Sequence, residues 1–192
     1  MPAYDADIAA AYKMAIIQTI RSFFAPVGYD EPKVIIPAPP TVYSIRPLTT
    51  RHLAEVMQLN LRCFKNGENY TKNTFSYLLS DPRILSYRVT TQRDEMAGFI
   101  FVILNPDGAA HITTIGVAPE HRRRGLGEKM LDHLEGALRA RGMTTVALEV
   151  RVGNKAAQNL YRQAGFSIVQ RMPKYYNNGE DGFLMLKSLV QI

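Results

Sequence analysis

Arg-Arg-Arg-Gly-Leu-Gly, residues 122–127, lies between an extended apolar run that ends near Val117 and a run of apolar residues at helical spacing. A helix that begins here presents unpaired backbone N–H groups and the positive end of its dipole. The two glycines let that backbone approach an anion closely, so the stretch predicts a cradle for a pyrophosphate group. The motif alone fits a solvated basic turn at a tight helix entry about equally well.

Two other phosphate-binding motifs do not fit this stretch. The third glycine of a dinucleotide-binding fingerprint is replaced by Met130, and no Gly-Lys-Ser/Thr follows as a nucleotide P-loop requires. Both of these nucleotide-binding folds are therefore disfavoured.

Outward from the loop, the chain alternates between short β-type runs and helical patterns. A helix beginning after Thr49 or Thr50 would bury Leu53, Val56, Met57 and Leu61, and the helix after the loop would bury Leu126, Met130, Leu134, Ala137 and Leu138 and end at Gly142. Further helices are expected at 72–79 and, with Asn154 as N-cap, at 155–164. Strands are expected at 43–46, 84–91, 96–104, 109–117, 144–152, 166–171 and 182–189, with a turn at Asp107-Gly108. The class is mixed α/β.

The N-terminal segment differs from the rest. Residues 5–24 carry an apolar stripe that predicts one amphipathic helix, and five prolines between residues 26 and 40 predict an extended connector. We therefore expect an N-terminal extension at 1–43 and one catalytic domain at 44–192.

Composition limits the class of protein. The 192 residues carry a net charge of +6, which suits a polyanionic ligand. Cys63 is the single cysteine, so an intramolecular disulfide is excluded and a reducing compartment, the cytoplasm by default, is expected. No stretch reaches the ~18 apolar residues of a membrane span, and no secretory signal is evident at the N-terminus.

Two further segments, 148–154 and 159–166, combine with residues 122–127 into a pattern that resembles the GNAT superfamily. Residues 67–70, 111–117 and 173–181 are similar to RimI-type protein N-acetyltransferases and to the catalytic subunit of the NatA complex, including archaeal relatives. The resemblance covers 44–189 and leaves 1–43 without a counterpart. It implies an α/β (α+β) fold, with a mixed, mostly antiparallel and splayed sheet of about seven strands, about four flanking helices and the N-terminal helical extension.

The resemblance implies acetyl-CoA as cofactor, with coenzyme A as product. The pantetheine arm would lie between the strand ending at Val117 and the strand carrying Glu149. The implied cofactor-binding residues are Ile115, Gly116, Val117, Arg122, Arg123, Arg124, Gly125, Leu126, Gly127, Glu128, Asn154 and Tyr161. For Asn154, capping the following helix is an alternative and compatible role.

Catalysis needs a neutral amine, and an α-amine with a pKa of about 7.7–8.0 needs only a modest base. Glu149, the one acid in an apolar strand, is the candidate base for direct attack in a ternary complex; a solvent-facing carboxylate, or one paired with Arg151, is the alternative. The family pattern also implies that Tyr161 assists the departing thiolate, although a tyrosine on such a helix often serves only the core.

Substrate recognition is assigned by resemblance to the flanking loops. The candidates are Glu68, Tyr70, His111, Tyr175 and Tyr176, with Glu68 a possible second base and His111 a possible assistant. His52, His121 and His133 show no metal-binding spacing, so no metal is assigned.

The favoured function is acetyl transfer to the N-terminal α-amine of proteins or peptides, with the ribosome or ribosomal proteins as compatible partners. A GNAT enzyme for a small amine or a lysine side chain is the first alternative, and a panel of peptides and small amines separates the two. A non-catalytic basic module for nucleic acid or ribosomes is the second; salt-sensitive RNA binding without acetyl-CoA binding would favour it.

Overall fold

The computed structural model describes residues 35–64 and 69–190, and the predicted helix at 5–24 lies outside them. The described chain forms one seven-stranded sheet in the order β1-β2-β3-β4-β5-β7-β6, which confirms the predicted fold class. The strands are β1 (Ser44–Pro47), β2 (Ile84–Thr90), β3 (Met96–Leu104), β4 (Ala109–Val117), β5 (Thr145–Arg151), β6 (Ser167–Met172) and β7 (Gly182–Ser188).

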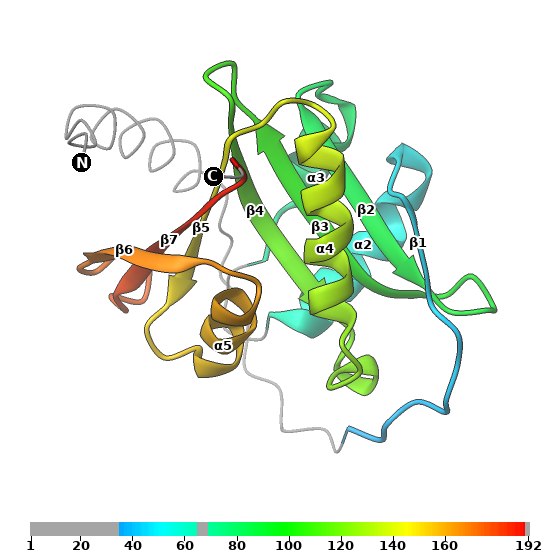
Figure 1. Cartoon of the computed structure of the whole chain (residues 1–192). Coiled ribbons are helices and arrows are strands. Elements are labelled where there is room, and N and C mark those ends of the chain that lie inside the picture. Colours follow the sequence, from blue (N-terminus) through cyan, green and yellow to red (C-terminus); the bar gives the residue numbers. More distant parts are fainter. Residues whose placement is uncertain (1–34, 65–68, 191–192) are drawn as a thin grey trace.

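Helices cover both faces of this sheet. In the view of Figure 1, α4 (Leu126–Arg139) and α5 (Lys155–Gln163) lie in front of the strands, and α2 (Leu53–Cys63) and α3 (Lys72–Ser80) lie behind them. Short 3-10 turns, η1 (Thr50–His52) and η2 (Pro119–His121), precede α2 and the loop before α4. The domain is thus a sheet between two helical layers.

Each face of the sheet has its own apolar core. On β3, Ile100 and Val102 join the cluster under α4 and α5, whereas Phe99 and Phe101 join the cluster under α2 and α3. Successive side chains of a strand point to opposite faces, so a central strand that is apolar throughout supplies both cores.

The two halves of the sheet meet at β4 and β5, which pair over a short distance. This parallel pairing joins Ala109–His111 to Thr145–Ala147 and goes no further, while β5 pairs with β7 along its whole length. An extra residue in β4, Thr113, interrupts its register with β3, because Phe101 faces Thr114 and Val102 faces Ile112. Such a bulge bends the strand. Beyond His111, β4 and β5 therefore separate, as the expected splayed sheet requires.

Local predictions hold with one correction. Gly142 (φ +72°) follows the end of α4, and Gly108 (φ +85°) occupies the predicted turn, where Asp107 Oδ1 accepts from the Ala109 amide at 3.0 Å. The prediction that Leu61 is buried was wrong: its side chain is 53% exposed, and Leu59 (3%) lies in the core instead. The buried face of α2 is formed by Val56, Leu59 and Asn60, three and four residues apart, and Leu61, five residues after Val56, falls outside this face.

Candidate functional site

A histidine–carboxylate pair lies where β4 and β5 separate. His111 is the last residue of β4 paired with β5, opposite Ala147, and Glu149 follows two residues later on the same face of the sheet. Its Oε2 lies 2.7 Å from His111 Nε2, and the two side chains are only 10% and 3% exposed. The split in the sheet therefore begins at a buried His–Glu hydrogen bond.

Glu149 does not take the alternative partner weighed from the sequence. Arg151 donates from Nη1 to Glu180 Oε2 at 2.5 Å and stacks over the Tyr176 ring, 4.0 Å from its centroid. Glu180 also accepts from the Gly153 amide at 2.8 Å. Arg151 thus serves the loop between β6 and β7, and the Glu149 carboxylate binds the buried histidine.

Tyr161 approaches the same carboxylate from the opposite layer. The residue is 6% exposed on α5, and its ring packs against Phe166 with centroids 5.9 Å apart. Burial, and then the charge of Glu149, raise the pKa of Tyr161 well above its usual value. The hydroxyl therefore stays protonated at neutral pH and can donate a hydrogen bond.

The loop at 122–127 has the geometry expected of an anion cradle. Arg123 (φ 62°) and Gly125 (φ 71°) adopt left-handed conformations on either side of Arg124, immediately before α4. Within the described part of the chain, the amides of residues 123–128 donate to no acceptor, and the first α4 hydrogen bond runs from the Lys129 amide to Gly125 O. Alternating backbone conformations of this kind form a concave set of N–H donors. We name residues 123–128 the nest.

The side chains of the three arginines differ in what they bind. Arg122 donates from Nε to Val117 O at 3.1 Å and from Nη2 to Cys63 O at 3.3 Å. Arg124 donates from Nη1 to Pro39 O at 3.0 Å and from Nη2 to Ala38 O, both in the proline-rich connector. For the exposed Arg123 side chain, no partner is found among the described residues. Of the three, Arg123 is the one whose guanidinium is available to an anion.

The two glycines of the motif have different structural roles. A Cβ on Gly125 would meet nothing within 4 Å, so this backbone faces open space. A Cβ on Gly127 would lie 2.8 Å from Leu160 Cδ2, so Gly127 allows the first turn of α4 to pack against α5. The open space before Gly125 is compatible with the predicted approach of an anion, whereas a side chain at Gly127 would displace Leu160.

At the entrance to α5, Asn154 acts as the helix cap: its Oδ1 accepts from the Ala157 amide at 3.1 Å. The neighbouring Gln158 is 1% exposed and donates from Nε2 to the carbonyls of Arg151 (2.9 Å) and Val152 (2.8 Å). Gln158 thereby ties α5 to the end of β5, and sequence reasoning missed it. Its position on the apolar side of the predicted helix was the signal in the sequence that could have indicated a buried, hydrogen-bonded role.

Two loops flank the His111–Glu149 pair. Tyr70 donates from its hydroxyl to the carbonyl of Thr113, the bulge residue, at 2.9 Å. Tyr175 and Tyr176 form an edge-to-face pair with centroids 5.0 Å apart in the β6–β7 loop. Glu68, the predicted second base, lies outside the described residues.

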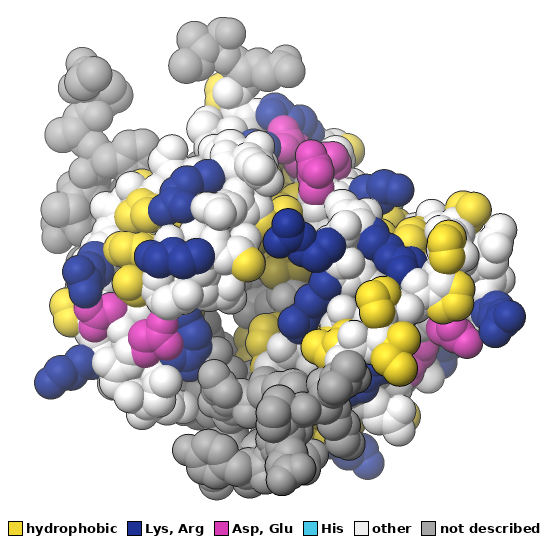
Figure 2. Space-filling model, turned by 90° about the horizontal axis from the view of Figure 1, so that it is seen from below, with side chains coloured by type: hydrophobic (Ala, Val, Ile, Leu, Met, Phe, Trp, Pro, Cys, Tyr) yellow, Lys and Arg dark blue, Asp and Glu magenta, His cyan; other side chains and the backbone are white. Residues whose placement is uncertain are grey.

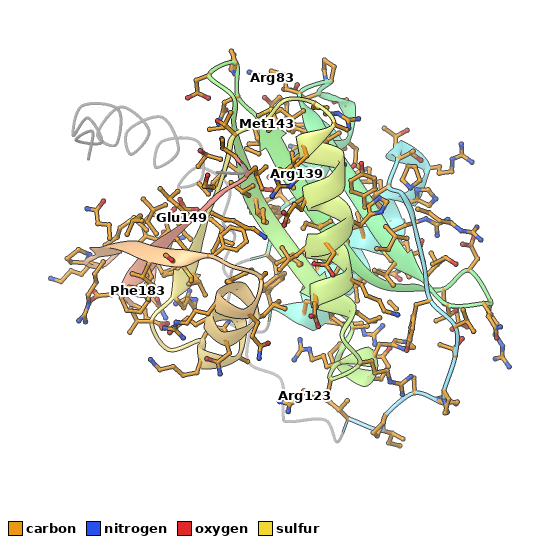
Figure 3. The ribbon with its side chains drawn as sticks, in the orientation of Figure 1. Arg83, Arg123, Arg139, Met143, Glu149 and Phe183 are labelled. Atoms are coloured by element: carbon orange, nitrogen blue, oxygen red, sulfur yellow. The ribbon has the colours of Figure 1, made fainter. Side chains whose placement is uncertain are left out.

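The lower end of the molecule, where α4 begins, is hollowed. Figure 2 shows an opening between two lobes at this end, with Lys and Arg side chains beside it. In Figure 3 Arg123 lies at this end and Glu149 lies on β5 above it. A ligand with its anionic end on the nest would therefore extend along β4 and β5 toward Glu149.

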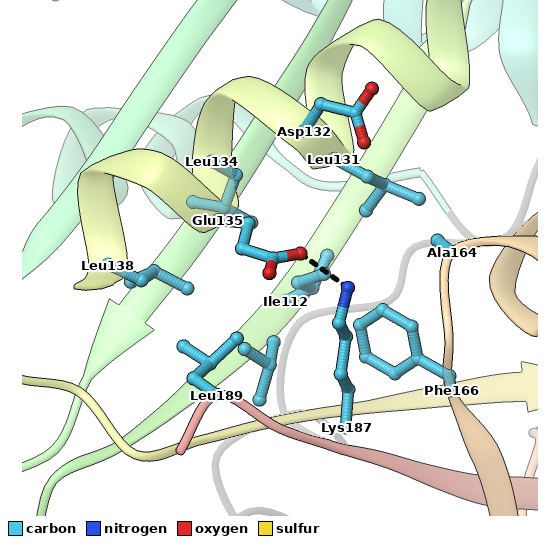
Figure 4. Close-up of a pocket in the computed structure, with 11 residues that line it drawn as sticks. Ile112, Leu131, Asp132, Leu134, Glu135, Leu138, Ala164, Phe166, Lys187 and Leu189 are labelled. Atoms are coloured by element: carbon cyan, nitrogen blue, oxygen red, sulfur yellow. Dashed lines mark hydrogen bonds and ion pairs between the residues drawn. The ribbon is translucent and has the colours of Figure 1, made fainter. Parts of the chain in front are cut away.

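A small pocket lies between α4 and β7 (Figure 4). Its walls are mainly apolar, and two of its polar side chains, Lys187 and Glu135, form an ion pair, with Arg139 also contacting Glu135. The described residues contain no cluster of three or more His, Cys, Asp or Glu side chains suited to a metal ion. Among the same residues, no helix has the length and apolarity needed to cross a bilayer.

Comparisons with known proteins agree with this geometry. The acetyltransferase (GNAT) family profile matches residues 53–166. The chain is 35% identical over 155 residues to "N-alpha-acetyltransferase daf-31" of Caenorhabditis elegans, covering 77% of this chain and 84% of that protein. It is 32% identical to the Arabidopsis thaliana "N-terminal acetyltransferase A complex catalytic subunit NAA10", covering 76% and 77%. The crystal structure of the Escherichia coli ribosomal-protein-S18-alanine N-acetyltransferase superposes with a TM-score of 0.72 at 30% identity, covering 79% and 96%.

Proposed function

Because the chain belongs to the acetyltransferase (GNAT) family, whose members use acetyl-CoA, we propose that it acetylates the N-terminal α-amine of proteins or peptides. The observation that carries this proposal is the His111–Glu149 pair at the point where β4 and β5 separate. A proton acceptor there lies beside the unpaired stretch between β4 and β5 beyond His111, which we call the groove.

The nest fits the diphosphate of acetyl-CoA. Six amides that donate to no acceptor among the described residues, at the start of a fourteen-residue helix, attract an anion through hydrogen bonds and the helix dipole. We assign these amides and the Arg123 guanidinium to the diphosphate, and the open edge of β4 at 115–117 to the pantetheine arm. Acetyl-CoA supplies the activated acetyl thioester.

Glu149, held by His111, receives the proton of the amine in this proposal. The attacking nitrogen must lose a proton as it bonds to the acetyl carbon, and a carboxylate at hydrogen-bonding distance, directly or through water, can accept it. The 2.7 Å contact with His111 fixes the orientation of the Glu149 carboxylate, which accepts the proton. His111 is thereby a positioning residue, and Glu149 the catalytic base.

Tyr161 donates a hydrogen bond or a proton to the leaving thiolate in this proposal. A thiolate that departs on the α5 side of the opened sheet needs a hydrogen bond or a proton, and the Tyr161 hydroxyl remains protonated there because burial raises its pKa. Base and acid thus approach the reacting atoms from opposite layers of the sheet.

Direct transfer is favoured over an acetylated enzyme. Burial raises the pKa of Cys63 to about 11, so the single cysteine is a thiol at neutral pH and a poor nucleophile. The acetyl group therefore passes from acetyl-CoA to the amine in one ternary complex.

An α-amine suits this site better than a lysine side chain. At pH 7.5 an α-amine of pKa about 7.7–8.0 is roughly a quarter to two-fifths neutral, whereas a lysine of pKa about 10.4 is ~0.1% neutral. Tyr70, Tyr175 and Tyr176 would line the approach of the first residues of a peptide, since they flank the His111–Glu149 pair. The proposal includes a cytoplasmic location, with newly made proteins and ribosomal proteins as substrates.

The test compares amines at equal concentration. Peptides beginning with Ser, Ala, Met or an acidic residue are incubated with acetyl-CoA, alongside N-terminally blocked peptides that contain lysine and a polyamine. Coenzyme A release gives the rate, and mass spectrometry locates the acetyl group. Acetylation of free N-termini in preference to the others is expected. A preference for the polyamine or for lysine would overturn the proposal, and the Glu149→Gln protein controls for uncatalysed transfer.

A further inference from the structure

The proline-rich connector continues into the catalytic domain as a strap over the loop that precedes α4. We define the strap as residues 38–43. The Ala38 amide donates to Glu120 O in η2 at 2.9 Å, and Glu120 in turn pairs with Arg62 at the end of α2. The strap is therefore attached to the segment that leads into the nest.

Arg124 binds the strap through three hydrogen bonds. Its Nη1 donates to Pro39 O at 3.0 Å and to the Tyr43 hydroxyl at 2.8 Å, and its Nη2 donates to Ala38 O. A guanidinium donates and never accepts, so the Tyr43 oxygen is the acceptor in this contact. The Arg124 side chain is therefore directed to the strap, while its backbone amide belongs to the nest.

Tyr43 extends the network to η2. Its hydroxyl lies 2.9 Å from His121 Nδ1, and the two rings meet edge to face with centroids 5.7 Å apart. Since the Tyr43 oxygen accepts from Arg124, its proton is free to be donated to His121 Nδ1. The chain Arg124–Tyr43–His121 thus joins the nest, the strap and η2.

The loop needs such support. Arg123 lies between Arg122 and Arg124 with φ 62°, a conformation that is unfavourable for a residue with a Cβ and persists only where neighbouring contacts impose it. Arg122 is fixed on one side by Val117 O and Cys63 O, and Arg124 is fixed on the other by the strap. Both neighbours of the left-handed residue are thereby held.

We propose that the strap and the Arg124 side chain hold the nest in its anion-binding shape, so that affinity for the diphosphate of acetyl-CoA depends on a segment outside the phosphate loop. This inference rests on the proposed function. Arg124 is a positioning residue in it: the side chain acts on the cofactor through the backbone of residues 123–125. Tyr43 acts through Arg124.

The experiment measures the Kd for coenzyme A by calorimetry and the KM and kcat for acetyl-CoA in the full chain. The variants are Arg124→Ala, Arg124→Lys, Tyr43→Phe and the double variant Arg124→Ala/Tyr43→Phe. Arg139→Ala is the matched control: Arg139 lies at the other end of α4 and also binds a carboxylate and the backbone carbonyl of Leu189.

Arg124→Ala is expected to raise Kd and KM about 3- to 10-fold with kcat unchanged, and Tyr43→Phe to raise them by a smaller factor in the same direction. The double variant is expected to match Arg124→Ala, because both changes remove one shared contact. Arg124→Lys should recover part of the affinity, and Arg139→Ala should change neither constant.

Two results overturn the inference. An unchanged Kd in Arg124→Ala shows that the nest holds without the strap. A raised Kd in Arg124→Ala with wild-type Kd in Tyr43→Phe contradicts the inference that Tyr43 supports the nest through Arg124. If the wild-type protein binds coenzyme A but acetylates no peptide, the proposed substrate fails while the strap inference stands. If it binds no coenzyme A, both fail.

Discussion

Replacing Glu149 by Gln tests the assignment of the base with little disturbance of the structure. Glutamine has the same shape, and its Oε1 can accept from His111 Nε2–H across the 2.7 Å separation now occupied by the carboxylate. The buried histidine keeps a partner, so the usual cost of an unsatisfied buried group is avoided. Loss of turnover would then report on proton transfer.

The size of the effect follows from the state of the amine. At pH 7.5 the cost of starting from a neutral α-amine of pKa about 7.7–8.0 is only about 0.6–0.8 kcal/mol, so the base contributes mainly when the nitrogen attacks and releases its proton. General-base catalysis contributes about 10²–10⁴-fold, and we expect the low end here, a fall in kcat of about 10² or about 2.7 kcal/mol.

The assay follows coenzyme A release with a saturating peptide, and calorimetry gives the affinity for coenzyme A. The fall should lie in kcat, with an unchanged Kd, because Glu149 lies at the far end of the groove from the nest. The double variant His111→Gln/Glu149→Gln should lose little more than Glu149→Gln, since His111 acts by holding that carboxylate. An unchanged kcat, or a Kd that rises as much as kcat falls, would refute the assignment.

Three further predictions follow from the geometry of single residues. Tyr161→Phe removes the hydroxyl and keeps the packing against Phe166, so kcat should fall about tenfold with an unchanged thermal midpoint. Gly125→Leu should raise the acetyl-CoA KM about tenfold or more with kcat retained, because the new side chain enters the open space before the nest and φ +71° disfavours a residue with a Cβ. The control is Gly136→Ala on the exposed face of α4, which should stabilise the fold by about 0.5–1 kcal/mol and leave the KM unchanged. Burial lowers the pKa of His121 below its usual 6.5, with Glu120 opposing and Arg124 adding to the effect. The native state therefore binds fewer protons than the unfolded chain and loses stability as the pH falls below 6.5. In urea unfolding at pH 7.5 and 5.5, His121→Asn should lose less stability than the wild type, and equal losses would contradict a lowered pKa of His121 in the folded state.

The secondary structure was largely predictable because each signal was local. β3 and β4 were predicted at their observed bounds, and the other described strands, α3 and α5 within one or two residues, since runs of β-branched residues, helical periodicity and Gly108 or Asn154 act through their immediate neighbours. The start of α2 was predicted two or three residues too early, because a 3-10 turn precedes it. Leu61 was mispredicted because the face buried in α2 contains Val56, Leu59 and Asn60, and both possible faces have helical spacing.

The sequence indicated which residues belong to the candidate site, but it did not indicate the contacts between them. The family pattern brought His111 and Glu149 into the candidate set, but their 2.7 Å contact depends on two strands 38 residues apart in sequence and on a bulge at Thr113 that no turn residue marks. Likewise, three consecutive arginines look equivalent in sequence. Their different roles arise because Val117 O, Cys63 O and the strap lie near the first and third, which only tertiary structure decides.

The nest and the position of the proposed base, Glu149, both follow from one break in the sheet. β4 parts from β5 after His111 because the Thr113 bulge bends it, and its far end delivers η2 and the left-handed loop to the start of α4. Closing the sheet beyond His111 would pair the edge of β4 with β5 and remove the space between the two strands. Deleting Thr113 should therefore abolish acetyl-CoA binding and turnover together, unlike Glu149→Gln, which should affect turnover alone. A deletion protein that folds and retains normal affinity for coenzyme A would show that the bulge does not open the groove.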